Sequence, residues 1–551
     1  MKNWRSYFIL ICFFLLAAAV LSRLAFLQTK KYGYYKALAE GQQKIIESEI
    51  GARGEIFFRN GEPLAINKTG KYVYICPREI KEKQETTKML AGALDLDEGW
   101  VEERVIKDNL FEVIKRRLTD EEIAVLTEKD LVGAYIKDDI YRYYPHQELA
   151  AHVSGFLNVD GQGQYGVEGF YDELLRGEEV LTEKQKSPFG FFSSKENESF
   201  GEDIVLTIDP SIQALAEELL AKYQQSLAFE SGQILVLQPN SGEIIALAQW
   251  PGFNPNFYSE VKEVDDFQNA FLQKIFEPGS VFKPIVMSAA INENKITPQT
   301  SYVDTGIVEI GSDVINNYDK RVYGAQTMTG VLEKSINTGA VFAERALGDR
   351  LFVQYIDDFG FFEKTNIDLQ GEVFSTNLEF KKGYEINFAT ASFGQGIEIT
   401  PIQIASAFAA IANGGKSITP HVLKIPNDAL DLSGQKQIIS EETSSQIVNM
   451  LLSVIENGFG KAAKIDGYYV AGKTGTAQVS WPALGIQKSG YSDKTAQTFI
   501  GFIPAFNPEF LVMVKLDNPQ TKTAEYSAVP IFKELGKYIV DYWQIAPDYE
   551  N

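Results

Sequence analysis

Residues 277 to 284 of this chain read Glu277-Pro278-Gly279-Ser280-Val281-Phe282-Lys283-Pro284. Ser280 and Lys283 are three residues apart, which brings both side chains to one face when the segment is helical. Pro278 and Gly279 punctuate the chain just before them, and the largely apolar stretch from Val281 to Asn294 is typical of a helix. Ser280 is therefore predicted at a helix N-terminus, where unpaired N–H groups favour a developing alkoxide or oxyanion. Serine is hardly ionised at neutral pH, so a partly desolvated Lys283 is the candidate base.

The pattern S-x-x-K occurs three times in the chain and cannot identify a nucleophile alone. Ser259 to Lys262 lies in a charged, surface-like run, and Ser433 to Lys436 lies in a polar turn. Only the segment at Ser280 combines a Pro-Gly break before the serine with an apolar, helix-like stretch after it.

Two further motifs follow Ser280 along the chain. They are Ser335-Ile336-Asn337 and Lys473-Thr474-Gly475-Thr476. Each motif has a second match, at Ser375-Thr376-Asn377 and at Lys68-Thr69-Gly70. The match at Lys68 precedes every candidate nucleophile, whereas Ser280, Ser335 and Lys473 follow one another in order. This ordered triplet resembles the penicillin-binding and serine β-lactamase family.

Flanking blocks narrow the resemblance to class B penicillin-binding proteins. In the C-terminal half they are Phe393-Gly394-Gln395-Gly396-Ile397, Ala412-Asn413-Gly414-Gly415, Ala471-Gly472-Lys473 and Phe499-Ile500-Gly501-Phe502-Ile503-Pro504. In the N-terminal half, Arg53-Gly54-Glu55-Ile56, Arg142-Tyr143-Tyr144-Pro145 and Gly166-Val167-Glu168 resemble the non-catalytic pedestal of those proteins. Phe58 departs from the pattern, because the family usually carries Asp there. No block resembles the glycosyltransferase domain of class A proteins, so a monofunctional enzyme is implied.

The glycines of these blocks, among them Gly394, Gly396, Gly414 and Gly415, are expected to serve backbone turns, since glycine mostly supplies positive φ or close packing. Phe499 to Ile503 is expected to be a core strand.

The resemblance implies a peptidoglycan D,D-transpeptidase, with the division type favoured over the elongation type. Ser280 would attack the penultimate D-Ala carbonyl of a stem pentapeptide, with Lys283 as base, and release the terminal D-Ala. Ser335 would relay a proton to the leaving amine, and Asn337 would hydrogen-bond the substrate backbone. Lys473 would lie on an edge strand beside the cleft.

In the same resemblance, Thr474, Gly475 and Thr476 would bind substrate, with the two threonines at its terminal carboxylate. The N–H groups of Ser280 and Thr476 would form the oxyanion hole. β-Lactams would act as covalent inhibitors at Ser280. The implied partners are peptidoglycan stem peptides, the membrane, a membrane-embedded glycan polymerase and divisome proteins.

Two other functions stay open at this point. A D,D-carboxypeptidase or β-lactamase-like hydrolase would use water in place of the acceptor amine, although the chain has no E-x-x-L-N block to supply a deacylating Glu. A non-catalytic β-lactam sensor or divisome scaffold would keep the fold, and a sensor could keep the motifs as well.

Charge and composition argue against other classes. Lys plus Arg is 52 and Asp plus Glu is 74, so the net charge is −22, which would repel a nucleic-acid backbone. Cys12 and Cys76 are poorly placed for a disulfide or a zinc site, and the three histidines form no H-E-x-x-H pair. We expect no metal and no cofactor.

The N-terminus predicts a single membrane span over residues 7–27, after a cytoplasmic tail of residues 1–6. Tyr7 to Leu21 carries no charge, and apolar residues resume from Leu24 to Leu27 after Arg23, which could snorkel to the headgroups. Lys2 and Arg5 precede the span, so the positive-inside rule places the rest of the chain outside the cytoplasm. A cleavable signal peptide ending near Ala17-Ala18-Ala19 is the alternative, and it also exports the protein.

Two domains are expected after the anchor. Residues 28–202 would form a mixed α+β pedestal, or dimerisation-like domain. Residues 203–547 would form an α/β transpeptidase domain, which the resemblance describes as an antiparallel sheet flanked by helices with an all-helical subdomain. Within the pedestal, Lys30 to Glu49 looks helical and Ser187 to Ser199 looks like a loop.

Local patterns support a boundary near Gly201. Ile204 to Ile208 is strand-like, and Asp209 is the expected N-cap of a helix over Ile212 to Ala221. Gln233 to Gln238 and Glu243 to Gln249 are predicted to be two strands of a hairpin.

Overall fold

The computed structural model describes residues 3–33, 44–50, 52–129, 131–177, 179–187, 190–193, 200–426 and 434–550. The chain divides into two compact units. One comprises Met1–Gly54 with Glu173–Glu202, and the other comprises Glu55–Asp172 with Asp203–Asn551.

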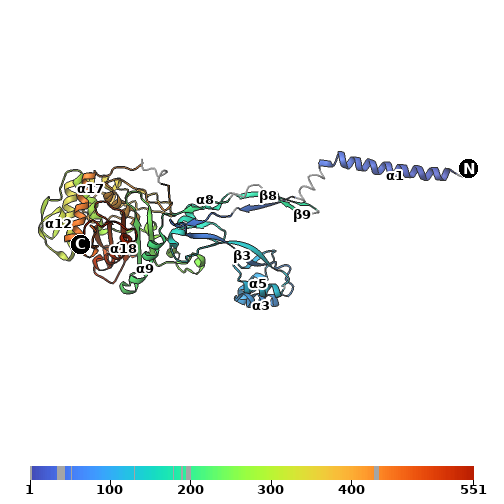
Figure 1. Ribbon diagram of the computed structural model, residues 1–551, viewed down its shortest axis with the longest axis horizontal. Helices are drawn as coiled ribbons and strands as arrows, with labels where there is room; N and C mark the ends of the chain where they lie inside the picture. The colour runs from blue at the N-terminus through green and yellow to red at the C-terminus, as the bar shows by residue number, and fades with distance from the viewer. Residues whose placement is uncertain are drawn as a thin grey trace. The chain divides into compact units, whose positions relative to one another are not determined.

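The first unit contains a long apolar helix, α1 (Trp4–Thr29), visible at the N-terminal end of the chain in Figure 1. Its 26 residues span about 39 Å at about 1.5 Å per residue, more than the roughly 30 Å of a bilayer core. None of its residues is buried. By length and composition, α1 is able to cross a membrane.

The same unit contains a three-stranded antiparallel sheet in the order β1 (Lys44–Ile50), β8 (Glu179–Ser187) and β9 (Gly190–Ser193). The helix expected over Lys30 to Glu49 is therefore wrong for residues 44–49, and residues 34–43 lie outside the described part of the chain. The loop expected over Ser187 to Ser199 is wrong where β9 forms, and residues 188–189 and 194–199 are not described. Both strands are stabilised by β8, a partner that the local pattern of β1 does not reveal.

The second unit begins with the pedestal sheet. Its strands are β2 (Ile56–Phe57), β3 (Pro63–Ile75), β4 (Glu112–Lys115), β5 (Ala134–Tyr143) and β10 (Ile204–Val205). The order is β10-β2-β3-β4, with β5 also paired to β3. The β10–β2 pair is parallel and the other pairs are antiparallel. A turn at Asn60-Gly61 joins β2 to β3, and Phe58 beside it is fully buried against His146.

Helices of the pedestal cover one end of this sheet. They are α3 (Lys83–Leu94), α4 (Glu98–Val105) and α5 (Asp120–Lys129), whose apolar residues form one core with β3. Short elements follow: α6 (Ala151–Ser154), β6 (Phe156–Leu157), β7 (Gly163–Gln164) and α7 (Gly166–Phe170). The next helix, α8 (Asp172–Arg176), belongs to the first unit from Glu173 onward. The buried Arg142 Nε donates to Glu168 Oε1 at 2.7 Å, so two of the pedestal-like blocks meet.

The transpeptidase part is organised on a five-stranded antiparallel sheet. Its order is β12 (Ile244–Trp250), β11 (Ser231–Leu237), β19 (Phe510–Asp517), β18 (Tyr491–Ile503) and β17 (Ala471–Ser480). The predicted hairpin of β11 and β12 and the predicted core strand from Phe499 to Ile503 are both confirmed. β17 is an edge strand of this sheet.

One face of the sheet is covered by α9 (Pro210–Leu227) and α18 (Ala528–Tyr542), which Figure 1 shows beside it. Asp209 caps α9 as predicted, because its Oδ1 accepts from the N–H groups of Ser211 and Ile212. The helix continues to Leu227, six residues beyond the expected end at Ala221.

The opposite side of the sheet carries a mainly helical subdomain. Its helices are α10 (Ala270–Gln273), α11 (Lys283–Asn292), α12 (Met328–Glu333), α13 (Asn337–Leu347), α14 (Asp349–Asp358), α15 (Glu385–Ala391), α16 (Pro401–Ala412) and α17 (Glu441–Asn457). Two small hairpins accompany them, β13 (Ser301–Asp304) with β16 (Gly324–Thr327) and β14 (Ile307–Ile310) with β15 (Asp313–Asn316). The first nine residues of α11 are all buried, which holds this helix firmly at the centre of the subdomain.

Short 3₁₀ turns complete the second unit. They are η1 (Pro255–Glu260), η2 (Val264–Phe267), η3 (Gly279–Phe282), η4 (Tyr318–Lys320), η5 (Phe380–Lys382), η6 (Lys461–Ala463), η7 (Pro482–Leu484) and η8 (Ala524–Tyr526).

Candidate active site

Ser280 lies in the 3₁₀ turn η3, which runs directly into the buried helix α11. Lys283 is the first residue of α11, and its side chain is completely buried. The Lys283 Nζ lies 2.9 Å from Ser280 Oγ. The predicted helix N-terminus and the predicted serine–lysine contact therefore both occur in the structure.

The S-x-N motif approaches the same lysine from the connection between α12 and α13. Lys283 Nζ donates to the main-chain O of Ser335 at 2.7 Å and lies 3.2 Å from Ser335 Oγ. Ser335 has a φ of 53°, in the left-handed region that is uncommon for a residue other than glycine. In this conformation, the main-chain O and the Oγ of Ser335 both face Lys283 Nζ. Asn337, at the start of α13, accepts from Lys283 Nζ through Oδ1 at 2.8 Å.

The K-T-G-T motif brings a second lysine from the edge strand β17. Lys473 Nζ donates to Ser335 Oγ at 3.0 Å and to the main-chain O of Thr474 at 2.9 Å. Gly475 lets β17 pack closely on the turn that carries Ser280, because a Cβ at this position would lie 3.0 Å from Val281 Cγ1. Thr476 is half-buried, and its Oγ1 accepts from the N–H of Ala524 at 3.2 Å.

The eight predicted site residues thus come together from three separated segments. Ser280, Lys283, Ser335, Asn337 and Lys473 form one continuous hydrogen-bonded group, with Thr474, Gly475 and Thr476 along the adjacent strand. This group can transfer a proton from the Ser280 hydroxyl to an amine and onward to a second hydroxyl.

The competing motif matches lie elsewhere or have structural roles. Ser259 is exposed in η1, and Lys68 lies in the pedestal strand β3. Ser375 Oγ donates to Glu398 Oε2 at 3.0 Å, and Asn377 bonds the main chain of the same residue. The third S-x-x-K match starts at Ser433, which lies outside the described residues.

Burial controls the electrostatics of the two lysines. Desolvation, and secondarily the positive charge of Lys473, hold the pKa of Lys283 well below its usual value. Desolvation lowers the pKa of Lys473 to about 7. In the described part of the chain, neither lysine forms an ion pair with a carboxylate that would restore its charge. Lys283 is therefore poised to accept a proton at neutral pH.

The turn that presents Ser280 is held by contacts that sequence reasoning missed. Glu277 Oε1 accepts from the N–H of Gly396 at 3.0 Å and from Tyr491 OH at 3.3 Å. Burial raises the pKa of Glu277 to about 7 despite these hydrogen bonds. The E-P-G-S block indicated that Glu277 is near the nucleophile. Nothing in the sequence indicated that its carboxylate would bond Gly396 and Tyr491.

The glycines that were expected to form turns do so. Gly394, Gly396, Gly414 and Gly415 have φ values of 79°, 70°, 86° and 93°. Gly394 also touches the nucleophile turn, because its carbonyl accepts from the N–H of Gly279 at 2.9 Å. A Cβ on Gly394 would lie 2.2 Å from the carbonyl oxygen of Gly279, which excludes a larger residue without a shift of this turn.

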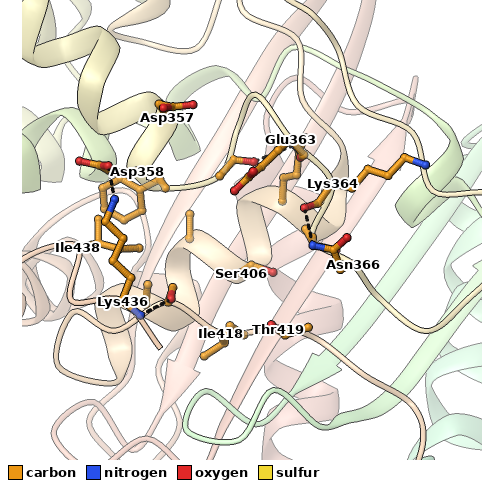
Figure 2. A pocket seen from close by; sticks show the side chains of 17 residues that line it. Asp357, Asp358, Glu363, Lys364, Asn366, Ser406, Ile418, Thr419, Lys436 and Ile438 are labelled. Atoms are coloured by element: carbon orange, nitrogen blue, oxygen red, sulfur yellow. Dashed lines mark hydrogen bonds and ion pairs between the residues drawn. The ribbon is translucent and has the colours of Figure 1, made fainter. Parts of the chain in front are cut away.

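A polar pocket between α14 and α16 is separate from this group. Figure 2 shows Asp358, Ser406 and Lys436 among its lining residues, with Lys436 paired to Asp358. None of the eight site residues lines it. Among the described residues, no cluster of three or more His, Cys, Asp or Glu side chains is arranged to hold a metal ion.

Two family models match the chain. The penicillin binding protein transpeptidase domain matches residues 232–537, and the penicillin-binding protein dimerisation domain matches residues 48–206. The chain belongs to the penicillin-binding protein family that carries these two domains. The family, the fold class and the transpeptidase class of enzyme predicted from the sequence are thereby confirmed.

Curated relatives place the chain more closely within the family. Stage V sporulation protein D of Bacillus subtilis is 34% identical over 486 residues, covering 85% of this chain and 74% of the relative. Probable peptidoglycan D,D-transpeptidase PenA of Neisseria gonorrhoeae is 30% identical, covering 97% and 92%. Peptidoglycan D,D-transpeptidase FtsI of Escherichia coli is 28% identical, covering 99% and 93%. The similarity to FtsI supports the predicted class B, division-type assignment.

Solved structures share the fold. A peptidoglycan synthetase from Bifidobacterium adolescentis has a TM-score of 0.71 at 21% identity, covering 92% of this chain and 98% of that structure. Penicillin binding protein 3 of Mycobacterium tuberculosis, complexed with aztreonam, has a TM-score of 0.68 at 23% identity, covering 91% and 98%.

Proposed function

We propose that this protein is a monofunctional peptidoglycan D,D-transpeptidase that cross-links stem peptides through an acyl-enzyme on Ser280. The observation that carries the proposal is the surroundings of Lys283 Nζ. Two of its contacts, Ser335 O at 2.7 Å and Asn337 Oδ1 at 2.8 Å, are oxygens that only accept hydrogen bonds. A neutral amine has two hydrogens, and these two oxygens take both. The remaining lone pair is then left for a hydroxyl, and Ser280 Oγ at 2.9 Å is nearer than Ser335 Oγ at 3.2 Å.

Acylation follows from this arrangement. Ser280 Oγ attacks the penultimate D-Ala carbonyl while its proton moves to Lys283 Nζ. The peptide C–N bond breaks, and the departing D-Ala amine takes a proton relayed through Ser335 Oγ, which lies 3.2 Å from Lys283 and 3.0 Å from Lys473. The amine of a second stem then attacks the ester, gives up a proton by the reverse route and regenerates Ser280.

The strand β17 would bind the donor substrate. The N–H groups of Ser280 and Thr476 are assigned to the oxyanion, and the hydroxyls of Thr474 and Thr476 to the terminal carboxylate. Because β17 is an edge strand, one of its sides has no strand partner in the described part of the chain, and an extended peptide could pair there. Asn337, opposite this strand, would bind the substrate backbone.

The proposal extends to the organisation of the chain. We assign residues 1–6 to a cytoplasmic tail, 7–27 to the anchor, 28–202 to the pedestal and 203–547 to the transpeptidase domain. Lys2 and Arg5, which precede the span at residues 7–27, favour an N-terminus inside the cell and catalysis outside the cytoplasmic membrane. A role in cell division, with a membrane-embedded glycan polymerase and divisome proteins as partners, fits the similarity to FtsI.

Fluorescent penicillin tests the nucleophile. Wild type is expected to take up one label per chain, and Ser280→Ala none. Ser259→Ala, at the exposed serine of a competing S-x-x-K match, is the matched control and should label like wild type. Labelling of Ser280→Ala would overturn the assignment.

The products separate transpeptidation from the alternatives. Wild type incubated with a pentapeptide stem and an acceptor amine should release D-Ala and form a cross-linked product. D-Ala release without cross-linking would identify a carboxypeptidase. Labelling without D-Ala release would identify a β-lactam sensor.

A further inference from the structure

Asn337 is held in one orientation by a contact behind the active site. Its Nδ2 donates to the main-chain O of Asn316, at the end of β15, at 3.0 Å. A carbonyl oxygen only accepts, so this contact requires the amide nitrogen on that side. The amide oxygen must then face Lys283, as it does at 2.8 Å. The position of Asn316 thus decides which end of the Asn337 amide the base encounters.

A buried carboxylate, Asp304 at the end of β13, lies beside the two segments that carry Asn316 and Asn337. Asp304 is 1% exposed and has no basic partner among its hydrogen bonds in the described chain. It accepts from Thr338 Oγ1 at 2.6 Å and from Asn317 Nδ2 at 3.0 Å. Main-chain N–H groups of Gly306 and Tyr323 add bonds of 2.9 and 2.7 Å.

Asp304 binds the side chains of Asn317 and Thr338, and each of these residues is next in the chain to Asn316 or Asn337. Asn317 follows Asn316, and Thr338 follows Asn337. A further bond closes the group, because the N–H of Thr338 donates to Asn317 Oδ1 at 3.1 Å. One carboxylate therefore fixes the first turn of α13 against the segment that supplies the Asn316 carbonyl.

We propose that Asp304, Asn317 and Thr338 are positioning residues for the reaction, because together they direct the Lys283 lone pair toward Ser280. If this group loosens, the Asn337 amide can rotate and present its NH₂ to Lys283. The amine would then turn its lone pair toward that NH₂ and away from the Ser280 hydroxyl. The inference rests on the proposed function, in which Lys283 is the base.

The test replaces the Thr338 hydroxyl. Thr338→Val keeps the shape of the side chain but removes its hydrogen bonds to the Asp304 carboxylate and to Tyr302 OH. We expect the second-order rate constant for acylation by fluorescent penicillin to fall by about ten- to a hundred-fold, the range given by loss of a hydrogen bond to a charged group. Thr338→Ser, which restores the hydroxyl, should stay within about threefold of wild type.

The fraction labelled at saturation separates positioning from folding. A structural defect lowers this fraction, whereas a positioning defect lowers the rate constant of the chains that do label. Thr305→Val is the matched control, because Thr305 lies in the same segment, is exposed and bonds only the Ile307 carbonyl in the described structure. Asp304→Asn, which removes the charge with little change of shape, is the second variant and should slow acylation in the same way.

The outcomes distinguish the two proposals. Failure of wild type to label, or labelling of Ser280→Ala, would overturn the proposed function. A labelling wild type with Thr338→Val and Asp304→Asn both at the wild-type rate constant would overturn the positioning role alone. Equal slowing in Thr305→Val would also overturn it, because that variant leaves the bonds of Asp304 intact.

Discussion

Asn337→Asp is the sharpest test of a neutral Lys283 base, because it exchanges one NH₂ for an oxygen with almost no change in shape. The new carboxylate would lie beside Lys283, where Asn337 Oδ1 is now 2.8 Å from Nζ. At an effective dielectric constant of about 20, two charges at this distance attract by roughly 6 kcal/mol. An attraction of this size corresponds to a rise of about four units in the pKa of Lys283. For each unit by which the raised pKa exceeds the assay pH, the neutral fraction of Lys283 falls tenfold, so acylation at neutral pH should fall markedly.

The pH dependence of acylation shows whether a raised pKa of Lys283 causes the loss of rate. A raised pKa of Lys283 moves the acid limb of the acylation profile to higher pH. The deficit of Asn337→Asp should therefore shrink as the pH rises from neutral to alkaline. Asn337→Ala removes the acceptor without adding a charge, so it should not show this alkaline recovery.

The assay is the rate constant for labelling by fluorescent penicillin, measured across the neutral and mildly alkaline range. Asn449→Asp makes the same change in net charge on the exposed face of α17 and should behave like wild type. An Asn337→Asp variant within about threefold of wild type at neutral pH would refute the reasoning. So would a deficit that stays constant as the pH rises.

Two further predictions concern stability and the nucleophile turn. Burial lowers the pKa of Lys473 from its ordinary value of 10.5 to about 7, so the burial penalty is complete below about pH 7 and disappears as the pH rises toward 10.5. Lys473→Met should therefore raise the free energy of unfolding by up to a few kcal/mol at neutral pH and by less at alkaline pH. Denaturant titrations measure this difference, and a gain in unfolding free energy that does not change with pH would contradict the prediction. Gly394→Ala should cost about 1–3 kcal/mol of stability and slow labelling of Ser280, since its Cβ would meet the Gly279 carbonyl at 2.2 Å. Gly485→Ala, also at positive φ but with no atom within 4 Å of the added Cβ, is the matched control and should leave labelling unchanged.

The site residues were predictable where short sequence motifs contain them. Ser280 and Lys283 share one turn of helix, so their contact follows from spacing alone. The contact of Ser335 with Lys283 was not predictable from spacing, because it depends on a left-handed φ of 53° at a residue that is not glycine. Order along the chain identified which three motifs belong together, while the hydrogen bonds among them required the fold.

Features that depend on distant partners escaped sequence reasoning. β1 is a strand because β8 pairs with it, and nothing in the polar, weakly apolar segment before residue 50 indicated that partner. Asp304 is similar, because the pattern Asp304-Thr305-Gly306 predicts only a local turn. Its bond to Thr338, 34 residues later, is a tertiary contact.

The two buried lysines explain how the site can hold a base without a carboxylate. Lys283 and Lys473 both bond Ser335 Oγ, at 3.2 and 3.0 Å, so their nitrogens are close neighbours in a buried site. Two positive charges there would repel each other strongly, and the pair is expected to carry no more than one proton near neutral pH. In the proposed mechanism, a substrate carboxylate bound at Thr474 and Thr476 attracts that proton to Lys473. The same event keeps Lys283 neutral, so binding of the correct substrate end prepares the base that activates Ser280.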